Sequence, residues 1–235
     1  MIILRRNALL MLKKIRSALR AFREGRGRDL LHIVRERWDS EVLSYGLRRD
    51  LSVPHSAPGA RIDVSVRLLR REDVPRILDP HEPGITEEDR EEIQTRLQVV
   101  EAEIHTCYVA VTADGVPCFM QWLIGPEENS KVQAYYKGIF PMVKPDEVML
   151  EGAFTPGVFR GKGIMAHVMS KLAEQGLDAG ARYAITFVPK GNIASLRGCQ
   201  RAGFAPYMLR RVQWRYFRKQ VTFASMPEGT PFPFD

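Results

Sequence analysis

The sequence predicts an α+β fold in one large domain that follows a basic helical arm. Strand-like and helix-like segments alternate from residue 62 onward, with a strand–helix–strand–helix order at the centre. The chain has 235 residues, of which 45% are hydrophobic, and this is enough to bury a sizeable core. Its positive charge is concentrated at one end: residues 1–38 hold eleven Lys/Arg and three Asp/Glu, whereas the other residues hold 24 and 25.

The basic arm is predicted to form an amphipathic helix over residues 3–23. At 100° per residue the apolar side chains fall within about a third of the circle, opposite most of the basic ones. The apolar set is Leu4, Ala8, Met11, Leu12, Ile15, Ala18, Leu19 and Phe22. Two interpretations stay open: the arm meets an anionic membrane surface or an acidic partner, or it packs on the body with its basic face solvated. A secretory signal is disfavoured, and a mitochondrial presequence stays open.

The segment between the arm and the body is predicted to contain a short helix around 27–38 and a short strand over 41–51. Residues 52–60, SVPHSAPGA, are rich in Pro, Ser and Gly and predict a loop or linker. We place the main domain boundary there. This gives an arm over 1–38, a connecting strand and linker over 39–61, and a body over 62–235. Whether the strand at 41–51 pairs with the body stays open.

Strands and helices of the body follow from local signals. Thr86 is a favoured N-cap residue with acidic residues after it, so a helix is expected to begin at 87. The turn ADG between two apolar runs predicts a hairpin, and the run RYAITFV predicts a buried strand. The expected strands are 64–69, 107–112, 117–124, 147–155, 182–188, 205–213 and 215–223, with a strand-like or irregular segment over 131–140. The expected helices are 73–78, 87–103, 161–178 and 193–202.

The stretch 157–169, GVFRGKGIMAHVM, combines three glycines and two basic residues with the start of a helix. Free backbone N–H groups and the positive end of the helix dipole attract anions at such a start. Glycines allow the backbone to approach an anion closely, because no Cβ intervenes. The stretch therefore predicts a phosphate-binding loop, to which Arg160 and Lys162 add positive charge. The loop is not a P-loop, because G-x-x-x-x-G-K-[ST] is absent.

The same stretch resembles the Q/R-x-x-G-x-G/A motif of the GCN5-related N-acetyltransferase superfamily. The matching residues are Arg160, Gly161, Lys162, Gly163, Ile164 and Met165, and Met165 stands where a small residue is usual. In that family the loop amides hold the pyrophosphate of acyl-coenzyme A. The resemblance implies the family fold, a central mixed and mostly antiparallel sheet flanked by helices. It is firm over about 147–204, extends over about 62–223, and does not include the arm.

A second match, GNIASLRGCQRAGF at 191–204, resembles the family segment that runs from an Asn to a Gly-Phe pair beside the pantetheine arm. Asn192 fits the start of this segment, so the resemblance implies a cofactor contact there. Asn192 is also a preferred N-cap for the helix expected at 193–202. Cys199 stands where the family often has a tyrosine that protonates the departing thiolate. A role for Cys199 as that acid and a role as a small buried apolar residue both stay open.

Glu151, in the strand expected over 147–155, is the candidate general base. A carboxylate near the acceptor amine removes its proton directly or through water. Strand alternation places Glu151 on one face with Met149 and Ala153, and an apolar setting of this kind raises the pKa of a carboxyl group. A structural Glu that bonds to a neighbouring loop is the alternative.

Gly152 lies inside the same strand and predicts a bulge or a close backbone approach. In the family, a bulge at this place separates two parallel strands so that pantetheine can bond to the exposed backbone. By resemblance, Ala153, Phe154 and Thr155 offer those backbone groups.

The residues and the resemblance together predict an N-acyltransferase that uses acetyl-coenzyme A or another acyl-coenzyme A as donor, without a metal. The acceptor is expected to be a small-molecule or peptide amine that attacks the thioester directly. Two alternatives stay open. One is transfer of a longer acyl chain from an acidic acyl carrier protein, and the other is a non-catalytic module that binds acyl-coenzyme A.

Composition and patterning disfavour several other classes of protein. No apolar run approaches the ~20 residues of a transmembrane helix. Cys107, Cys118 and Cys199 are odd in number and lack metal-like spacing, so neither a disulfide framework nor a zinc site is expected. The near-neutral body gives little support to specific nucleic-acid binding. The expected location is the cytoplasm, with attachment to the inner face of the membrane left open.

Overall fold

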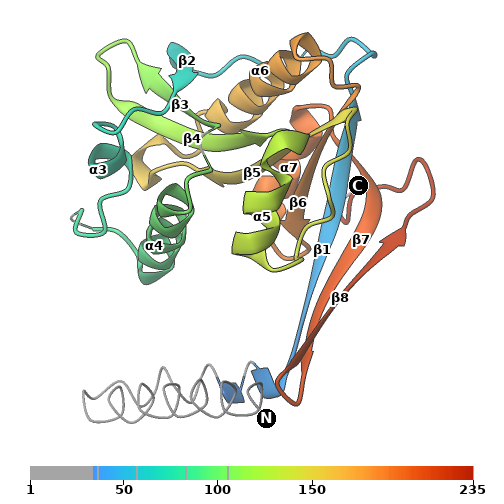
Figure 1. Cartoon of the computed structure of the whole chain (residues 1–235). Helices are drawn as coiled ribbons and strands as arrows, with labels where there is room; N and C mark the ends of the chain where they lie inside the picture. Colours follow the sequence, from blue (N-terminus) through green and yellow to red (C-terminus); the bar gives the residue numbers. More distant parts are fainter. Residues whose placement is uncertain (1–33, 36, 57, 83, 105, 235) are drawn as a thin grey trace, which may run out of the picture. The chain divides into compact units, whose positions relative to one another are not determined.

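The computed structural model describes residues 34–35, 37–56, 58–82, 84–104 and 106–234. Within them, eight strands form one sheet in the order β2-β3-β4-β5-β6-β1-β7-β8 (Figure 1). The strands are β1 (Asp39–Asp50), β2 (Val64–Leu68), β3 (Cys107–Thr112), β4 (Pro117–Ile124), β5 (Glu147–Phe154), β6 (Tyr183–Pro189), β7 (Ala205–Arg215) and β8 (Arg218–Ser225). The helices are α3 (Val74–Ile77), α4 (Glu87–Glu101), α5 (Asn129–Tyr136), α6 (Ile164–Asp178) and α7 (Ile193–Arg201), with short 3-10 helices η1 (Pro126–Glu128) and η2 (Gly157–Phe159).

The sheet is mixed and mostly antiparallel, which confirms the predicted fold class. The pairs β1–β6, β2–β3, β3–β4 and β4–β5 run antiparallel, whereas β5 and β6 run parallel. A parallel pair needs a crossover connection, and α6 supplies it between β5 and β6. The expected N-cap also forms, because the Thr86 hydroxyl accepts from the Asp89 amide at 3.0 Å.

Two apolar clusters lie on the two faces of the sheet. One holds the buried side chains of α6 and α7, and the other holds those of α3, α4 and α5. Along β5 the alternation is direct, since Val148 and Leu150 belong to the first cluster and Met149 belongs to the second. Helices therefore cover the sheet on both sides.

The strand that follows the arm lies inside the sheet. β1 pairs antiparallel with β6, in a register from Ser44↔Pro189 to Asp50↔Tyr183, and so it separates β6 from β7. Leu47 near its centre is fully buried. This answers the question that the sequence left open: the strand pairs with the body, and it belongs to the sheet instead of serving only as a connection.

The chain divides into two compact units. The first comprises Met1–Val42 and Arg211–Thr222, and the second comprises Leu43–Arg210 and Phe223–Asp235. All the site residues predicted from the sequence lie in the second unit. The amphipathic helix expected over 3–23 lies outside the described residues. Of the helix expected around 27–38, residues 34, 35, 37 and 38 are described, and these are helical. In the described part of the chain, no helix has the length and apolar character needed to cross a membrane.

The expectation of a strand-like or irregular segment over 131–140 is wrong, because α5 occupies most of it. Aromatic and β-branched residues favour strands locally, but tertiary contacts favour the helix here. The Asn129 side chain donates to the Val143 carbonyl at 2.8 Å and accepts from the Val143 amide at 2.9 Å. Tyr136 packs edge-on against Phe140, with ring centroids 4.7 Å apart. These contacts join residues that the local pattern does not connect.

Candidate active site

The two parallel strands at the centre of the sheet separate before they end. β5 and β6 pair over three residues only, and the last pair is Met149↔Ile185. Both strands continue for several residues beyond it. The later backbone groups of β5 on this side are therefore not bonded to β6. Unpaired strand backbone of this kind can bond to an extended ligand.

Gly152 forms the bulge that the sequence predicts in β5. Between the pairs Trp122↔Glu151 and Met120↔Phe154, β5 contains one residue more than β4. Gly152 has a φ of 68°, a conformation that favours glycine. A Cβ at this position would lie 2.6 Å from an atom of the Trp122 ring. Glycine is thus required both by the backbone conformation and by the space beside the indole.

The bulge also changes which side chains share a face of β5. Met149 and Phe154 belong to the apolar cluster of α4 and α5, whereas Ala153 packs against the cluster of α6 and α7. The expected grouping of Glu151 with both Met149 and Ala153 is therefore wrong for Ala153. One extra residue reverses the alternation, and period-two counting along a strand does not anticipate it.

Gly152→Ala is expected to lower the free energy of unfolding by about 2–5 kcal/mol, from left-handed strain and overpacking against Trp122. Gly115→Ala is the matched control, because its φ is 72° but a Cβ there meets no atom within 4 Å. The control should lose only the strain component, about 1–2 kcal/mol. Chemical denaturation of both variants measures the difference, and equal losses would show that the indole does not restrict this position.

The glycine-rich loop ends at the N-terminus of α6, although the helix begins at Ile164 and not at 161 as expected. Gly163 is the N-cap residue with a φ of 75°, and no side chain caps the first turn. Acidic residues are also absent from that turn. Its N–H groups therefore have no side-chain acceptor among the described residues, and such groups favour an anion. Gly161 likewise has a φ of 75°, so the loop uses both glycines for its backbone path.

Arg160 is held by protein groups. Its Nε donates to the Thr155 carbonyl at 3.0 Å, and its guanidinium forms an ion pair with Asp89 in the first turn of α4. Burial acts to raise the pKa of the Asp89 carboxyl, but hydrogen bonds from Arg160 and Thr86 outweigh it and the pKa is lowered. Asp89 is therefore ionised at neutral pH and offsets the charge of Arg160. The ion pair fixes the loop to α4.

Lys162 differs from Arg160, because it contacts an aromatic ring and no carboxylate of the described chain. Its Nζ lies over the Phe159 ring, 5.1 Å from the ring centroid, and it has no carboxylate partner among the described residues. The Lys162 carbonyl accepts from the Arg61 amide at 2.8 Å. Arg61 thus brings a third basic residue to the loop, which sequence reasoning missed. The only sequence feature that could have indicated Arg61 is its position as a basic residue directly after the linker, which is rich in Pro, Ser and Gly.

Met165 and Ile164 contribute their side chains to the core and their backbone to the first turn of α6. Ile164 is buried, and Met165 packs against α7. A Cβ on Gly198 would lie 2.9 Å from the Met165 sulfur. The missing side chain of Gly198 therefore makes room for the long side chain of Met165. This explains how a large residue occupies a position where the motif usually has a small one.

Asn192 caps α7, as one interpretation of it predicted. Its side-chain oxygen accepts from the Ser195 amide at 3.0 Å. Cys199, within α7, is fully buried, with its Sγ 4.0 Å from the Met169 sulfur. Burial, with a further contribution from the charge of Glu151, raises the pKa of the Cys199 thiol to about 12. The packing supports a structural role for Cys199, since a side chain without exposed surface cannot touch a departing thiolate. All three cysteines are free and buried.

Glu151 is partly exposed as a residue, but its Oε2 atom is enclosed and has no hydrogen-bond partner among the described residues. Burial raises the pKa of this carboxyl, and the charge of Arg210, the Gly152 amide and the charge of Arg96 oppose the shift only in part. Neither arginine forms an ion pair with Glu151 within the described chain. A buried carboxylate oxygen without a hydrogen-bond partner, here Oε2, is well suited to accept a proton.

Arg210 was missed by sequence reasoning. Its guanidinium carbon lies over the rings of Phe140 and Phe187, 4.8 Å and 5.0 Å from their centroids. Its Nη2 donates to the Ser44 hydroxyl at 3.0 Å, whereas its buried Nε has no partner in the described chain. The pKa of Arg210 is lowered, because the effect of burial exceeds the opposing effect of the Glu151 charge.

Two further residues beside Glu151 were also missed. Arg96 of α4 donates to the carbonyl of Ala153 at 3.2 Å. Burial and the charge of Glu151 raise the pKa of Tyr136 in α5. These residues and Arg210 come from elements far apart in the sequence, so no spacing could have identified them.

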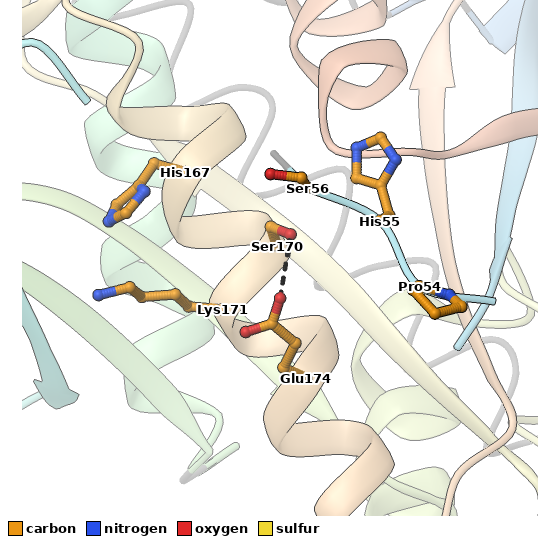
Figure 2. Close-up of a pocket in the computed structure, with 7 residues that line it drawn as sticks. All are labelled: Pro54, His55, Ser56, His167, Ser170, Lys171 and Glu174. Carbon is orange, nitrogen blue, oxygen red and sulfur yellow. Dashed lines mark hydrogen bonds between the residues drawn. The ribbon is translucent and has the colours of Figure 1, made fainter. Parts of the chain in front are cut away.

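A cavity of about 570 Å³ lies along α6, from His167 in its first turn to Glu174 (Figure 2). It is lined by Pro54, His55, Ser56, His167, Ser170, Lys171 and Glu174. In Figure 2 the loop with His55 and Ser56 faces Ser170, which donates to Glu174 at 3.5 Å. No predicted site residue lines this cavity. It does not gather three side chains able to hold a metal ion, and nor does any other place in the described chain.

No protein-family model and no curated protein sequence matches the chain. Solved structures do match. The chain is similar to an acetyltransferase from the GNAT family of Colwellia psychrerythraea, with a TM-score of 0.50 and 14% identity over 80% of this chain and 61% of that one. It is also similar to the GCN5-related glucosamine N-acetyltransferase region of a fungal multi-domain GH3 β-N-acetylglucosaminidase, with a TM-score of 0.55 and 13% identity over 81% of this chain and 23% of that one. The chain thus spans less than two thirds of either protein, and the likeness shows a shared fold.

Proposed function

We propose that this chain, whose fold is that of the GCN5-related N-acetyltransferases, transfers an acyl group from acyl-coenzyme A to the amine of an acceptor. The proposal rests on one arrangement: β5 separates from β6 after Met149, and α6, which follows a glycine-rich loop, begins without a side-chain cap from the described residues. The separated strand offers backbone bonds to an extended pantetheine arm. The start of the helix offers an anion site to the pyrophosphate.

The residues of the loop would have different roles in binding acyl-coenzyme A. The amides of Gly163, Ile164 and Met165 would hold the pyrophosphate, and Lys162 would add positive charge. Arg160 would act as a positioning residue, because its ion pair with Asp89 fixes the loop to α4.

The backbone of Ala153, Phe154 and Thr155 would bond to the pantetheine arm. An N–H group of this strand would also polarise the thioester carbonyl and stabilise the oxyanion that forms during attack. The carbonyl oxygens of Ala153 and Thr155 already accept from Arg96 and Arg160. These bonds hold the strand in place after β6 has separated from it.

The transfer would proceed by direct attack of the acceptor on the thioester. The neutral amine nitrogen forms a bond to the carbonyl carbon, and the carbon–sulfur bond breaks. Glu151 accepts the proton that the amine loses, either directly or through one water. The thiolate of coenzyme A leaves and takes a proton from water, because the buried Cys199 cannot reach it.

The two substrates would approach from opposite faces of the sheet. Glu151 belongs to the face covered by α4 and α5, where Arg96, Arg210 and Tyr136 also lie, and the acceptor would enter there. Acyl-coenzyme A would lie against α6 and α7 on the other face. The amine and the thioester would meet where β5 and β6 separate.

Calorimetric titration with coenzyme A and acetyl-coenzyme A, followed by turnover assays with a panel of small-molecule and peptide amines, tests this function. We expect acetyl-coenzyme A to bind and at least one amine to be acylated. Binding without turnover of any amine would favour the non-catalytic module. Turnover with an acyl carrier protein donor alone would favour the long-chain alternative, and absence of binding to any acyl-coenzyme A would overturn the proposal.

Cys199→Ala is expected to change turnover by no more than about threefold, or roughly 0.6 kcal/mol of activation free energy. The side chain has no exposed surface, so its loss should alter packing against Met169 and leave the reacting groups in place. Steady-state kinetics of the folded variant measure this. A loss of turnover by about a hundredfold would return the acid role to Cys199.

A further inference from the structure

A second surface, independent of the proposed active site, lies in the first compact unit at the turn between β7 and β8 (Figure 1). Tyr216 and Phe217 form this two-residue turn and are 68% and 52% exposed. Trp38, which is 52% exposed, packs edge-on against both rings at centroid distances of 4.9 Å and 5.9 Å. We call these three residues the aromatic tip.

The backbone of the aromatic tip is one that its residues disfavour. Tyr216 has a φ of 49° and Phe217 a φ of 64°, both in the left-handed region. A two-residue hairpin turn with two positive φ angles is of type I′, for which Asn-Gly is a favoured pair. Bulky residues fit this conformation poorly. Two exposed aromatic rings kept at such positions indicate a role other than stability.

Basic side chains accompany the aromatic tip. The stretches of this unit after residue 33 hold six Lys/Arg against three Asp/Glu. Two of the acids are paired within the unit: Asp39 with Arg215, and Glu41 with Arg211 at 3.4 Å. The surplus charge beside the exposed rings is therefore positive.

From this combination we infer that the aromatic tip docks the protein on an anionic lipid surface. Tyr and Trp favour the interface of a membrane with water, where the ring leaves water and its polar edge stays hydrated. The basic residues would meet the negative charge of the headgroups. Val34 and Val42, each about half exposed, add aliphatic surface to the same unit. Lipid accommodates aliphatic surface, whereas stacking of nucleic-acid bases uses aromatic faces.

The preceding sequence fits the same lipid surface. Residues 1–33 hold nine Lys/Arg and two Asp/Glu, and their apolar residues follow a helical period. A single weak membrane signal gives only reversible attachment, whereas two signals together give stable anchoring. The aromatic tip would supply a second signal beside that of residues 1–33.

The test exchanges the turn residues for the pair that the turn favours. Tyr216→Asn combined with Phe217→Gly, in the full chain, removes both rings and suits a type I′ backbone. We therefore expect its Tm to equal or exceed that of the unchanged protein. We expect its partition onto vesicles of phosphatidylcholine with phosphatidylserine, measured by sedimentation at low salt, to fall by about tenfold or more. The unchanged protein should bind these vesicles better than vesicles of phosphatidylcholine alone.

The matched control is Leu68→Ser combined with Val116→Ser, which removes two exposed apolar side chains from the other unit. It should bind the vesicles as the unchanged protein does. Equal binding by the turn variant would overturn the proposal. A lower Tm of the turn variant would assign the rings to hairpin stability and overturn it as well. A dimer that the turn variant abolishes, without vesicle binding by the unchanged protein, would assign the tip to a second copy instead of lipid.

Discussion

Gly163→Val is expected to weaken coenzyme A binding by well over tenfold, or more than about 1.4 kcal/mol. Gly163 has a φ of 75°, which a β-branched residue adopts only with strain. A Cβ there would also contact the backbone of the linker, 3.5 Å from the Gly59 carbonyl oxygen. The strained φ and the branched side chain beside the linker should shift the loop, and with it the amides proposed to bind the pyrophosphate.

Gly157→Val is the matched control for this change. Gly157 begins the same loop region, its φ is not positive, and a Cβ there meets no atom within 4 Å. Calorimetric titration of both variants with coenzyme A, together with thermal melting to verify the fold, separates a local from a general effect. Unchanged affinity in a folded Gly163→Val protein would remove the phosphate site from this loop. An equal loss in Gly157→Val would show that any bulk in the region suffices.

Glu151→Gln is expected to lower turnover by about 10²–10⁴-fold, the usual contribution of a general base. Coenzyme A affinity should stay nearly unchanged, because the change removes a proton acceptor and leaves the start of α6 intact. Single-turnover kinetics with the best amine, set beside calorimetric binding, measure the two effects separately. Full activity at neutral pH would give the role of base to water or to another residue.

The raised pKa of Glu151 predicts opposite effects of pH on turnover and on stability. Turnover should fall as the pH drops through the raised pKa, because the base becomes protonated. For stability, the folded state binds this proton more tightly than the unfolded state does. The favourable contribution is present below the ordinary carboxyl pKa and is lost as the pH rises through the raised one. At neutral pH the Glu151→Gln protein should therefore be as stable as the unchanged protein or more stable.

Glu147→Gln provides a control on the same strand. The Glu147 carboxylate accepts from the Lys144 amide at 3.2 Å and pairs with the Lys144 ammonium at 3.1 Å. Its loss should therefore reduce stability and leave turnover nearly unchanged. A matching loss of turnover in both variants would indicate that any change of charge in β5 disturbs the site.

The sequence by itself determined the features that depend on local backbone chemistry. Thr86 and Asn192 cap their helices, and Gly152 marks a bulge, because a short polar side chain or a missing Cβ acts within a few residues of its own position. A helix directly after the glycine-rich loop was predictable for the same reason, although α6 begins at Ile164 and not at 161. Three glycines and two basic residues before an apolar helical period predict an anion-binding turn without reference to any other element.

Only the tertiary structure decided how distant elements meet. The place of β1 between β6 and β7, the helix α5 and the ion pair of Arg160 with Asp89 all depend on contacts between residues apart in the sequence. The burial of Cys199 and the surroundings of Glu151 also depend on such contacts. A periodic sequence pattern shows which face of a helix or strand is apolar, but it does not indicate which other helix or strand packs against that face. Packing of the whole chain selects those partners. In α5, for example, long-range contacts override the strand preference of the β-branched and aromatic residues.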